Sequence, residues 1–247
     1  MLLAACGGKP QQNRPMGVAG ECPICGDVQQ YLAQADTMEC VLCRQQGVAE
    51  ACCASEHYIC EECHAAGIDS VFQACMNETS SDPVAVFERL VSMPSCHMHG
   101  PEHHIIVGAA LLTAYHNAGG EVDLQEALVE IVRRGKQVPG GACGRWGACG
   151  AALSAGMFVS IVTNNSPFAT EAWHLSNRAT AEALMSISEH GGPRCCKRDS
   201  YKALQSAVEF TKRELGVEMG QTQITCTRYA KNEQCLGTGC PYFPKGK

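Results

Sequence analysis

The stretch Pro101-Glu-His-His-Ile-Ile-Val-Gly-Ala-Ala-Leu-Leu-Thr-Ala-Tyr-His-Asn117 decides the fold class of this chain. Ile105, Ala109 and Leu112 recur in it at intervals of three and four residues. That spacing places side chains on one face of an α-helix. The stretch therefore predicts a helix over residues 101–117.

Start signals of further helices lie on both sides of this stretch. Asp82-Pro83 combines a capping carboxylate with a proline at the first helical position, and Asp123 caps a segment that ends in basic residues. No segment alternates convincingly with period two, so the core is expected to be almost entirely α-helical. Trp173 is expected in that core. The predicted helices cover residues 82–90, 101–117, 124–134, 148–162, 170–189 and 199–215.

The composition limits the classes of function. The chain has 247 residues, a formal net charge of −6 and 45% apolar residues. An acidic chain is a poor candidate for binding nucleic acid through its phosphates, because that requires a basic surface. Eighteen residues are cysteine, several times the ordinary frequency, and the apolar content suffices for a core without disulfide staples. The cysteines are therefore expected to bind metal or to react.

Signals for export or membrane insertion are weak. Leu3-Ala-Ala-Cys6 resembles a lipoprotein cleavage box, but the apolar run before it is shorter than the about 7–15 residues of a signal-peptide core. The longest apolar segment, 148–163, is interrupted by glycines and falls short of the roughly 20 residues of a membrane span. We expect a soluble cytoplasmic protein with reduced thiols; the lipoprotein interpretation requires a start upstream of Met1.

The cysteine pattern divides the chain into four parts. A flexible lead-in rich in Gly, Pro and Gln precedes a small Cys-rich module that resembles a zinc ribbon. A helical core domain follows, and an irregular tail with three cysteines ends the chain. The fold class is therefore expected to be mostly α. The four parts cover residues 1–21, 22–80, 81–218 and 219–247.

Three Cys-x2-Cys pairs give the Cys-rich module the spacing of metal sites. Two thiolates on such a tight turn reach one tetrahedral ion at about 2.3 Å. Eight ligands suffice for two closed structural zinc sites, whose pairing, sequential or interleaved, the spacing leaves open. Free thiols or an iron–sulfur centre are the alternatives, and Cys52 or His64 could replace a neighbour. The expected ligands are Cys22, Cys25, Cys40, Cys43, Cys53, His57, Cys60 and Cys63.

Cysteines and histidines also gather at three predicted helix starts of the core, near residues 96–104, 140–150 and 191–199. A helix start offers free N–H groups and the positive end of the dipole, which favour anions and lower the pKa of a thiol. If the three starts converge, they form one pocket of thiols, imidazoles and amide donors. The expected thiolate ligands are Cys143, Cys149, Cys195 and Cys196, with Cys96, His103 and His104 as neighbours and Arg145, Arg194 and Lys197 as cations.

Two kinds of chemistry fit such a pocket. Its thiolates could bind an iron–sulfur cluster, or could carry electrons or sulfur by disulfide and persulfide exchange. The tail adds Cys226, Cys235 and Cys240, the last followed by proline as in ferredoxin-type runs. Three thiolates are one short of a closed site, so a fourth ligand must come from elsewhere, for example Cys6, Cys75 or a histidine. Cys75 itself is expected to be buried.

Several of these strings resemble an uncharacterised family of unknown function from anaerobic bacteria and archaea. They are Gly-Pro-Glu-His-His at 100–104, Gly-Gly-Ala-Cys-Gly-Arg-Trp-Gly-Ala-Cys-Gly-Ala-Ala at 140–152 and Gly-Gly-Pro-Arg-Cys-Cys-Lys-Arg-Asp at 191–199. The segment His57–His64 is similar to its Cys-rich module, so the likeness covers most of 22–243. Members are sometimes fused to, or described as, SAM-dependent methyltransferase or radical-SAM proteins. No strand–Gly-x-Gly–helix unit in this chain would hold the SAM nucleoside.

A looser similarity links Cys143, Cys149 and Cys195-Cys196 to the redox-active family named for its C-GCAxxG-C-C signature. The chain departs from that signature, because Ala148-Cys149-Gly150 stands where the family has Gly-Cys-Ala. Neither resemblance implies an established reaction.

Together these patterns favour a metal-binding, cysteine-rich protein of anaerobic metabolism that acts in redox chemistry or sulfur transfer. Two structural zinc ions and an iron–sulfur cluster are the expected cofactors. A redox or sulfur-donor protein is the expected partner, with a methyltransferase or radical-SAM protein as a further candidate; neither nucleic acid nor membrane is expected. The alternative function is that of a non-catalytic adaptor or accessory domain for a SAM-dependent methyltransferase or radical-SAM partner.

Overall fold

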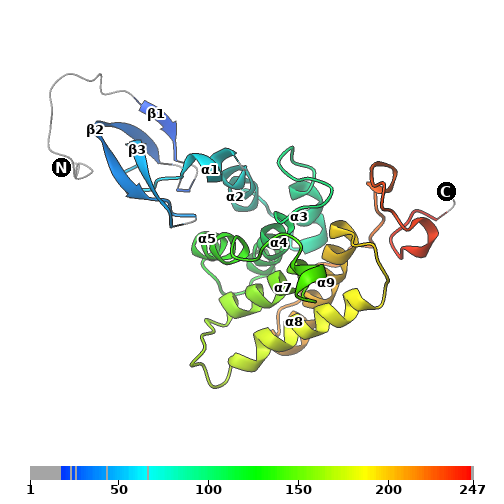
Figure 1. Cartoon of the computed structure of the whole chain (residues 1–247). Coiled ribbons are helices and arrows are strands. Elements are labelled where there is room, and N and C mark those ends of the chain that lie inside the picture. The colour runs from blue at the N-terminus through cyan, green and yellow to red at the C-terminus, as the bar shows by residue number, and fades with distance from the viewer. Residues whose placement is uncertain (1–17, 23, 26, 43, 66, 246–247) are drawn as a thin grey trace. The chain divides into compact units, whose positions relative to one another are not determined.

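The computed structural model describes residues 18–22, 24–25, 27–42, 44–65 and 67–245. The chain divides into two compact units, one ending at Ala74 and the other beginning at Cys75 (Figure 1). Most of the lead-in expected over residues 1–21 lies outside the described residues. The four-part division of the chain stays a prediction.

The first unit is built on a three-stranded antiparallel sheet in the order β1-β2-β3. β1 (Val18–Glu21) pairs with β2 (Val28–Glu39), which pairs with β3 (Gln46–Cys52). The short helix α1 (Glu61–Ala65) and the first turns of α2 (Ile68–Met76) follow. The sequence did not predict the strands individually, because no side chain of β2 is buried and the alternation of a half-buried strand is therefore missing.

Two tight turns carry Cys22, Cys25 and Cys40 in this unit. The Cys22 N–H donates to the Asp27 carbonyl at 2.7 Å, in the turn that joins β1 to β2. The Cys40 N–H donates to the Gln45 carbonyl at 2.8 Å, in the turn that joins β2 to β3. The two turns therefore lie at opposite ends of β2.

The second unit is helical, and α4 (His103–Asn117) is its central element. Leu111 and Leu112 at the middle of α4 are fully buried, and so is nearly every other side chain of this helix. Four helices pack against it: α3 (Pro83–Leu90), α5 (Leu124–Gly135), α7 (Gly150–Val162) and α9 (Cys196–Phe210). The unit is completed by α6 (Ala142–Arg145), α8 (Trp173–Ser188) and a π-helical turn over Thr211–Leu215.

The helix start signals read from the sequence act as caps. Asp82 Oδ1 accepts hydrogen bonds from the N–H groups of Val84 at 2.8 Å and Ala85 at 3.4 Å. Asp123 Oδ1 accepts from the Glu126 N–H at 3.0 Å. Each cap satisfies donors that a helix start leaves without a partner. The predicted helices are confirmed, with ends that differ by a few residues.

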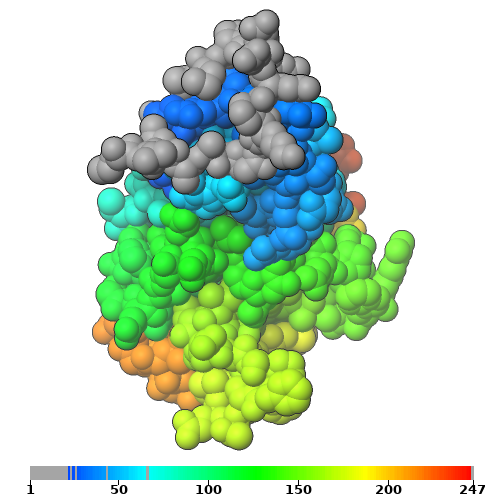
Figure 2. All heavy atoms as spheres, turned by 90° about the vertical axis from the view of Figure 1, so that its left-hand side faces the viewer, coloured from blue at the N-terminus to red at the C-terminus, as the bar shows by residue number. Residues whose placement is uncertain are grey.

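The expectation that Trp173 lies in the core is wrong. Its side chain is 52% exposed at the first residue of α8, and Phe168 before it is 93% exposed. The connection that carries Phe168, yellow-green in Figure 2, projects from the helical unit. Helix α8 buries only the small side chains of Ala179 and Ala183, so little of this helix belongs to the core.

The tail folds back onto the helical unit without forming long helices. Its longest regular elements are the 3-10 turns Tyr229–Lys231 and Gly237–Gly239. The Cys226 N–H donates to the Tyr242 carbonyl at 2.8 Å, and the Tyr242 hydroxyl donates to Gln205 Oε1 on α9 at 2.6 Å.

The chain is thus mostly α, with a small Cys-rich module before the helical core and an irregular Cys-containing tail after it, as the sequence predicts. Within the described part of the chain, no helix combines the length and the apolar character of a membrane-spanning segment.

Candidate metal centres and thiol sites

Four predicted ligands of the first unit form one compact set. The Cys25 and Cys53 sulfurs are 3.7 Å apart, and His57 Nδ1 lies 3.4 Å from the Cys53 sulfur and 3.7 Å from that of Cys22. All four ligand atoms lie within 4.8 Å of one another. A tetrahedral zinc ion with bonds of about 2.3 Å holds its sulfur ligands about 3.8 Å apart. This set could therefore hold one metal ion.

Cys40, Cys60 and Cys63 form a second set, and all three side chains are buried. The sulfurs of Cys40 and Cys63 are 3.9 Å apart, and the Cys60 N–H donates to the Cys40 sulfur at 3.3 Å. Cys43, the fourth predicted ligand, lies outside the described residues. His64 does not join the set, since its Nδ1 contacts the carboxylate of Asp69.

The two sets are interleaved along the chain, a choice that the spacing alone leaves open. The first set joins the turn before β2 to the segment after β3, and the second joins the turn after β2 to the start of α1. The hairpin of β2 and β3 explains this order. Its register pairs Gln30, near the start of β2, with Cys52, at the end of β3, and so brings Cys53 close to the turn that carries Cys22 and Cys25.

A pocket in the second unit brings the three tail cysteines together with Cys195, at the start of α9. Cys195, Cys226, Cys235 and Cys240 all line this pocket, whose cavity volume is about 20 Å³. Cys195 was not among the fourth ligands considered for the tail. Of those, Cys6 lies outside the described residues. Cys75 is buried, as expected, and burial raises its pKa to about 12.

The spacing of these four sulfurs differs from that of the first unit. In the described part of the chain, no three of them lie within 4.8 Å of one another. One ion draws its ligands closer than that, whereas a cluster distributes its thiolates over several iron atoms. We call this set the four-cysteine pocket.

Asn232 connects the four-cysteine pocket to two helix starts. Its Nδ2 donates to the Cys195 sulfur at 3.5 Å, and its Oδ1 lies 3.1 Å from His99 Nε2. His99 Nδ1 in turn accepts from the Cys196 N–H at 3.5 Å. The amide is buried, so these bonds fix the tail against α9 and the loop before α4.

Burial favours the protonated form of two of the pocket thiols, Cys226 and Cys195. It raises the pKa of Cys226, and the neighbouring sulfurs of Cys195 and Cys240 raise that pKa further. Burial also raises the pKa of Cys195, although the N–H groups of Arg198 and Lys197 act to lower it. A metal centre that binds these sulfurs directly would favour their thiolate form, because metal binding displaces the thiol proton.

The remaining core cysteines do not gather into a metal set. Among the described residues, no group of three ligand atoms within 4.8 Å includes Cys143, Cys149 or Cys196. Burial, followed by the Asp199 carboxylate, raises the pKa of Cys149 to about 12, and burial raises that of Cys196. The expectation of lowered thiol pKa values at helix starts is therefore wrong for both, because desolvation outweighs the N–H donors.

The predicted helix starts nevertheless lie together. A Cβ atom on Gly150 at the start of α7 would lie 2.0 Å from His104 Cδ2, so the imidazole covers that glycine. His104 Nδ1 donates to the Val138 carbonyl at 3.1 Å. Arg145 and Arg194, expected to hold anionic charge, are exposed.

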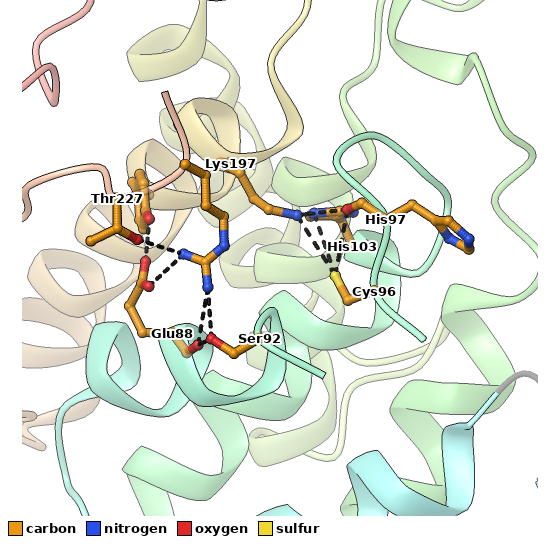
Figure 3. Close-up of polar contacts among 9 residues, drawn as sticks. Glu88, Ser92, Cys96, His97, His103, Lys197 and Thr227 are labelled. Carbon is orange, nitrogen blue, oxygen red and sulfur yellow. Dashed lines mark hydrogen bonds and ion pairs between the residues drawn. The ribbon is translucent and has the colours of Figure 1, made fainter. Parts of the chain in front are cut away.

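A third group has possible ligand atoms within 4.8 Å of one another and consists of Cys96, Glu102 and His103. The side chain of Lys197 already contacts this group. Lys197 Nζ donates to His103 Nε2 at 2.7 Å and to the His97 carbonyl at 2.8 Å, and lies 3.7 Å from the Cys96 sulfur (Figure 3). His103 Nδ1 donates to the Gly100 carbonyl at 3.0 Å. Both imidazole nitrogens are thus engaged, so a metal ion could bind His103 only by displacing Lys197.

Two contacts near these sites had no signal in the sequence. Arg228 donates to Glu88 Oε2 at 2.6 Å and to Ser92 Oγ at 2.7 Å, as Figure 3 shows around Glu88 and Ser92. Asn232 contacts Cys195 across 37 positions, and Arg228 contacts Glu88 across 140. Pairs so distant in sequence leave no local pattern.

Comparison with protein families finds a match to the model described as a family of unknown function (DUF5714), over residues 71–243. The comparison with curated proteins finds no match, and neither does that with solved structures. The match contains the four-cysteine pocket and Lys197 but not the segment His57–His64, whose likeness was also expected. It does not bear on the methyltransferase and radical-SAM fusions or on the C-GCAxxG-C-C signature. Because it covers more than half of the chain, this protein belongs to that family of unknown function, DUF5714.

Proposed function

We propose that this protein is a redox protein with an iron–sulfur cluster in the four-cysteine pocket and two structural zinc ions in the first unit. The observation that carries the proposal is the pocket itself, in which Cys195 supplies the ligand that the three tail cysteines lack. A cluster bound by four thiolates transfers single electrons.

The surroundings of the pocket support a cluster. Tyr201 and Tyr242 pack edge to face at 5.1 Å between ring centroids, and Tyr229 and Phe243 do so at 5.0 Å. All four rings line the pocket and limit the access of water. Hydrogen bonds to cluster thiolates tune the potential. The Gly237 N–H, which lies 3.4 Å from the Cys235 sulfur, and the Asn232 amide would provide them.

The first unit supports zinc for a different reason. Its two sets have the short sulfur–sulfur spacing of a single tetrahedral ion, and the first has three thiolates and one imidazole. With four protein ligands, a zinc ion has no open position for substrate. The role of these ions would be to hold the fold.

The partner that we propose is a redox or sulfur-donor protein. Phe168, Trp173 and Met185, which is 70% exposed, are large apolar side chains in or beside α8 that such a partner could cover. Use of the same surface by a methyltransferase or radical-SAM protein would suit the alternative role of an adaptor.

Metal and sulfide analysis of the full chain, purified without oxygen, tests the cluster. We expect iron and acid-labile sulfide in equal amounts together with two zinc ions, and an EPR signal after reduction. Cys226→Ser should lose iron and sulfide but keep zinc, whereas Cys25→Ser should lose zinc and keep iron. Cys143→Ser, at a cysteine outside both kinds of site, is the matched control.

A colourless protein that contains only zinc, with a metal content unchanged by Cys226→Ser, would rule out the cluster. Persulfide on Cys196, detected by mass spectrometry of the native protein, would favour sulfur transfer over simple electron transfer.

A further inference from the structure

A second cavity of the helical unit lies next to the four-cysteine pocket and shares Met98, Lys197 and Arg228 with it. Its volume is about 440 Å³, within the range of small-molecule sites. Three segments form it: the loop over 91–98, the start of α9 and the tail over 227–231. We call it the Cys96 cavity, after the thiol in its wall.

The charges around this cavity are of one sign. Lys197, Arg228 and Lys231 line it, and none of the described residues that line it carries a carboxylate. Glu88 neutralises Arg228, since their side chains form an ion pair at 2.6 Å. Lys197 and Lys231 remain as cations at the cavity wall, which therefore has the charge that attracts an anion.

Of these two cations, Lys197 gives the stronger indication of an anion site, because its side chain is almost completely buried. Only 2% of it is exposed, and its ammonium donates to the His97 carbonyl and His103 Nε2 and contacts the Cys96 sulfur, none of which is a carboxylate. Within the part of the chain that the structure describes, no carboxylate lies within 4.0 Å of Nζ. A buried cation without an anionic partner is costly. An anion that enters the cavity would therefore supply the partner that Lys197 lacks.

Cys96 gives the cavity a thiol, whose pKa is raised by burial. Its sulfur lies 3.7 Å from Lys197 Nζ and 3.9 Å from His103 Nε2 (Figure 3). An anion held by Lys197 would therefore be placed beside this sulfur.

We infer that the Cys96 cavity binds a small organic anion, a carboxylate or another oxyanion, and holds it against the Cys96 thiol. Lys197 and Lys231 recognise the negative charge, and the Cys96 sulfur faces the neighbouring carbon or sulfur atom of the ligand. The inference goes beyond the proposed redox function and does not depend on a cluster in the adjacent pocket.

Two alkylating probes of nearly equal size and different charge test this inference. In both, the Cys96 sulfur attacks the CH₂ carbon, a C–S bond forms, the C–I bond breaks and iodide leaves with the electron pair; the thiol proton goes to solvent. Iodoacetate carries the carboxylate that the cavity should recognise, and iodoacetamide does not. Mass spectrometry of the full chain gives the alkylation rate at each cysteine.

We expect the ratio of the iodoacetate rate to the iodoacetamide rate to be about tenfold higher at Cys96 than at Cys143 in the same sample. Lys231→Gln, at an exposed position, should lower the Cys96 ratio severalfold, and Lys197→Met should remove the preference. Lys212→Gln removes an exposed lysine away from the cavity and should leave the ratio unchanged. Inorganic sulfate should protect Cys96 from iodoacetamide in the unmodified chain.

Equal ratios at Cys96 and Cys143, together with no effect of Lys231→Gln and no protection by sulfate, would overturn the inference. If Lys197→Met does not fold, the Lys231→Gln ratio and the sulfate protection decide the question, because neither perturbs a buried residue. Iron content, which tests the four-cysteine pocket, is measured separately, so the two proposals can fail independently.

Discussion

His103 is a histidine held in one neutral form by its two hydrogen bonds. Its Nδ1 carries the proton that is donated to the Gly100 carbonyl, so Nε2 is the acceptor for the Lys197 ammonium. Burial, with the charge of Lys197, lowers the pKa of His103 from 6.5 to about 3. A histidine of this kind orients a lysine, and it is a poor general acid at neutral pH.

This depressed pKa predicts how stability depends on pH. Because an unfolded His103 binds its proton near pH 6.5 and the folded one only near pH 3, its contribution is complete above pH 6.5 and is lost as the pH falls. Between pH 7 and pH 5 the unmodified chain should lose about 2 kcal/mol more unfolding free energy than His103→Gln. Urea unfolding at both pH values measures this. His116→Gln, at an exposed position, is the control, and an identical pH dependence of all three proteins would contradict the prediction.

At the scale of elements, the central position of α4 depends on a close approach that Gly108 permits. A Cβ atom there would lie 2.5 Å from Ile131 Cδ1 on α5 and 2.8 Å from Ser154 Oγ on α7. The Gly108 N–H also donates to Ser154 Oγ at 2.8 Å. Ile131 and Ser154 are both fully buried, so a shift of either neighbour would disturb the packing around it.

Gly108→Ala should therefore destabilise the helical unit by about 1–3 kcal/mol through overpacking, although alanine favours helix formation. Thermal unfolding of the full chain measures the change. Gly144→Ala is the matched control, since a Cβ atom there would meet nothing within 4 Å. Equal melting temperatures for the two variants would show that α4 can shift to make room.

The elements also show what the sequence can reveal. Helices capped by Asp82 and Asp123 were predictable, because their signals are local. The β2 strand was not, because its exposed side chains lack alternation. The neighbour of the tail cysteines was missed for a similar reason: Cys195 shares their pocket only after the chain folds back over α9, and no spacing rule spans that distance.

At the scale of the whole molecule, the two units use cysteine differently. The second unit has an apolar core around α4, and its four-cysteine pocket lies where the tail meets α9. In the first unit, most of the described buried cysteines belong to the two sets that could hold a metal ion. Few other apolar side chains are buried in the described part of its sheet region; Ile24, Leu42 and Ala49 are among them. A unit with so small a core needs an additional source of stability, and a bound metal can provide it.

Zinc removal should therefore unfold the first unit and leave the second folded. After treatment of the full chain with a zinc chelator, limited proteolysis should cut within residues 18–65 at least about tenfold faster, because metal-binding free energy is folding free energy in such modules. Cleavage within α4 should stay unchanged, since this helix depends on apolar packing. Added Zn²⁺ should restore protection of 18–65. Equal cleavage rates with and without zinc would mean that the sheet and its turns are stable without metal, and that the interleaved cysteines have another role.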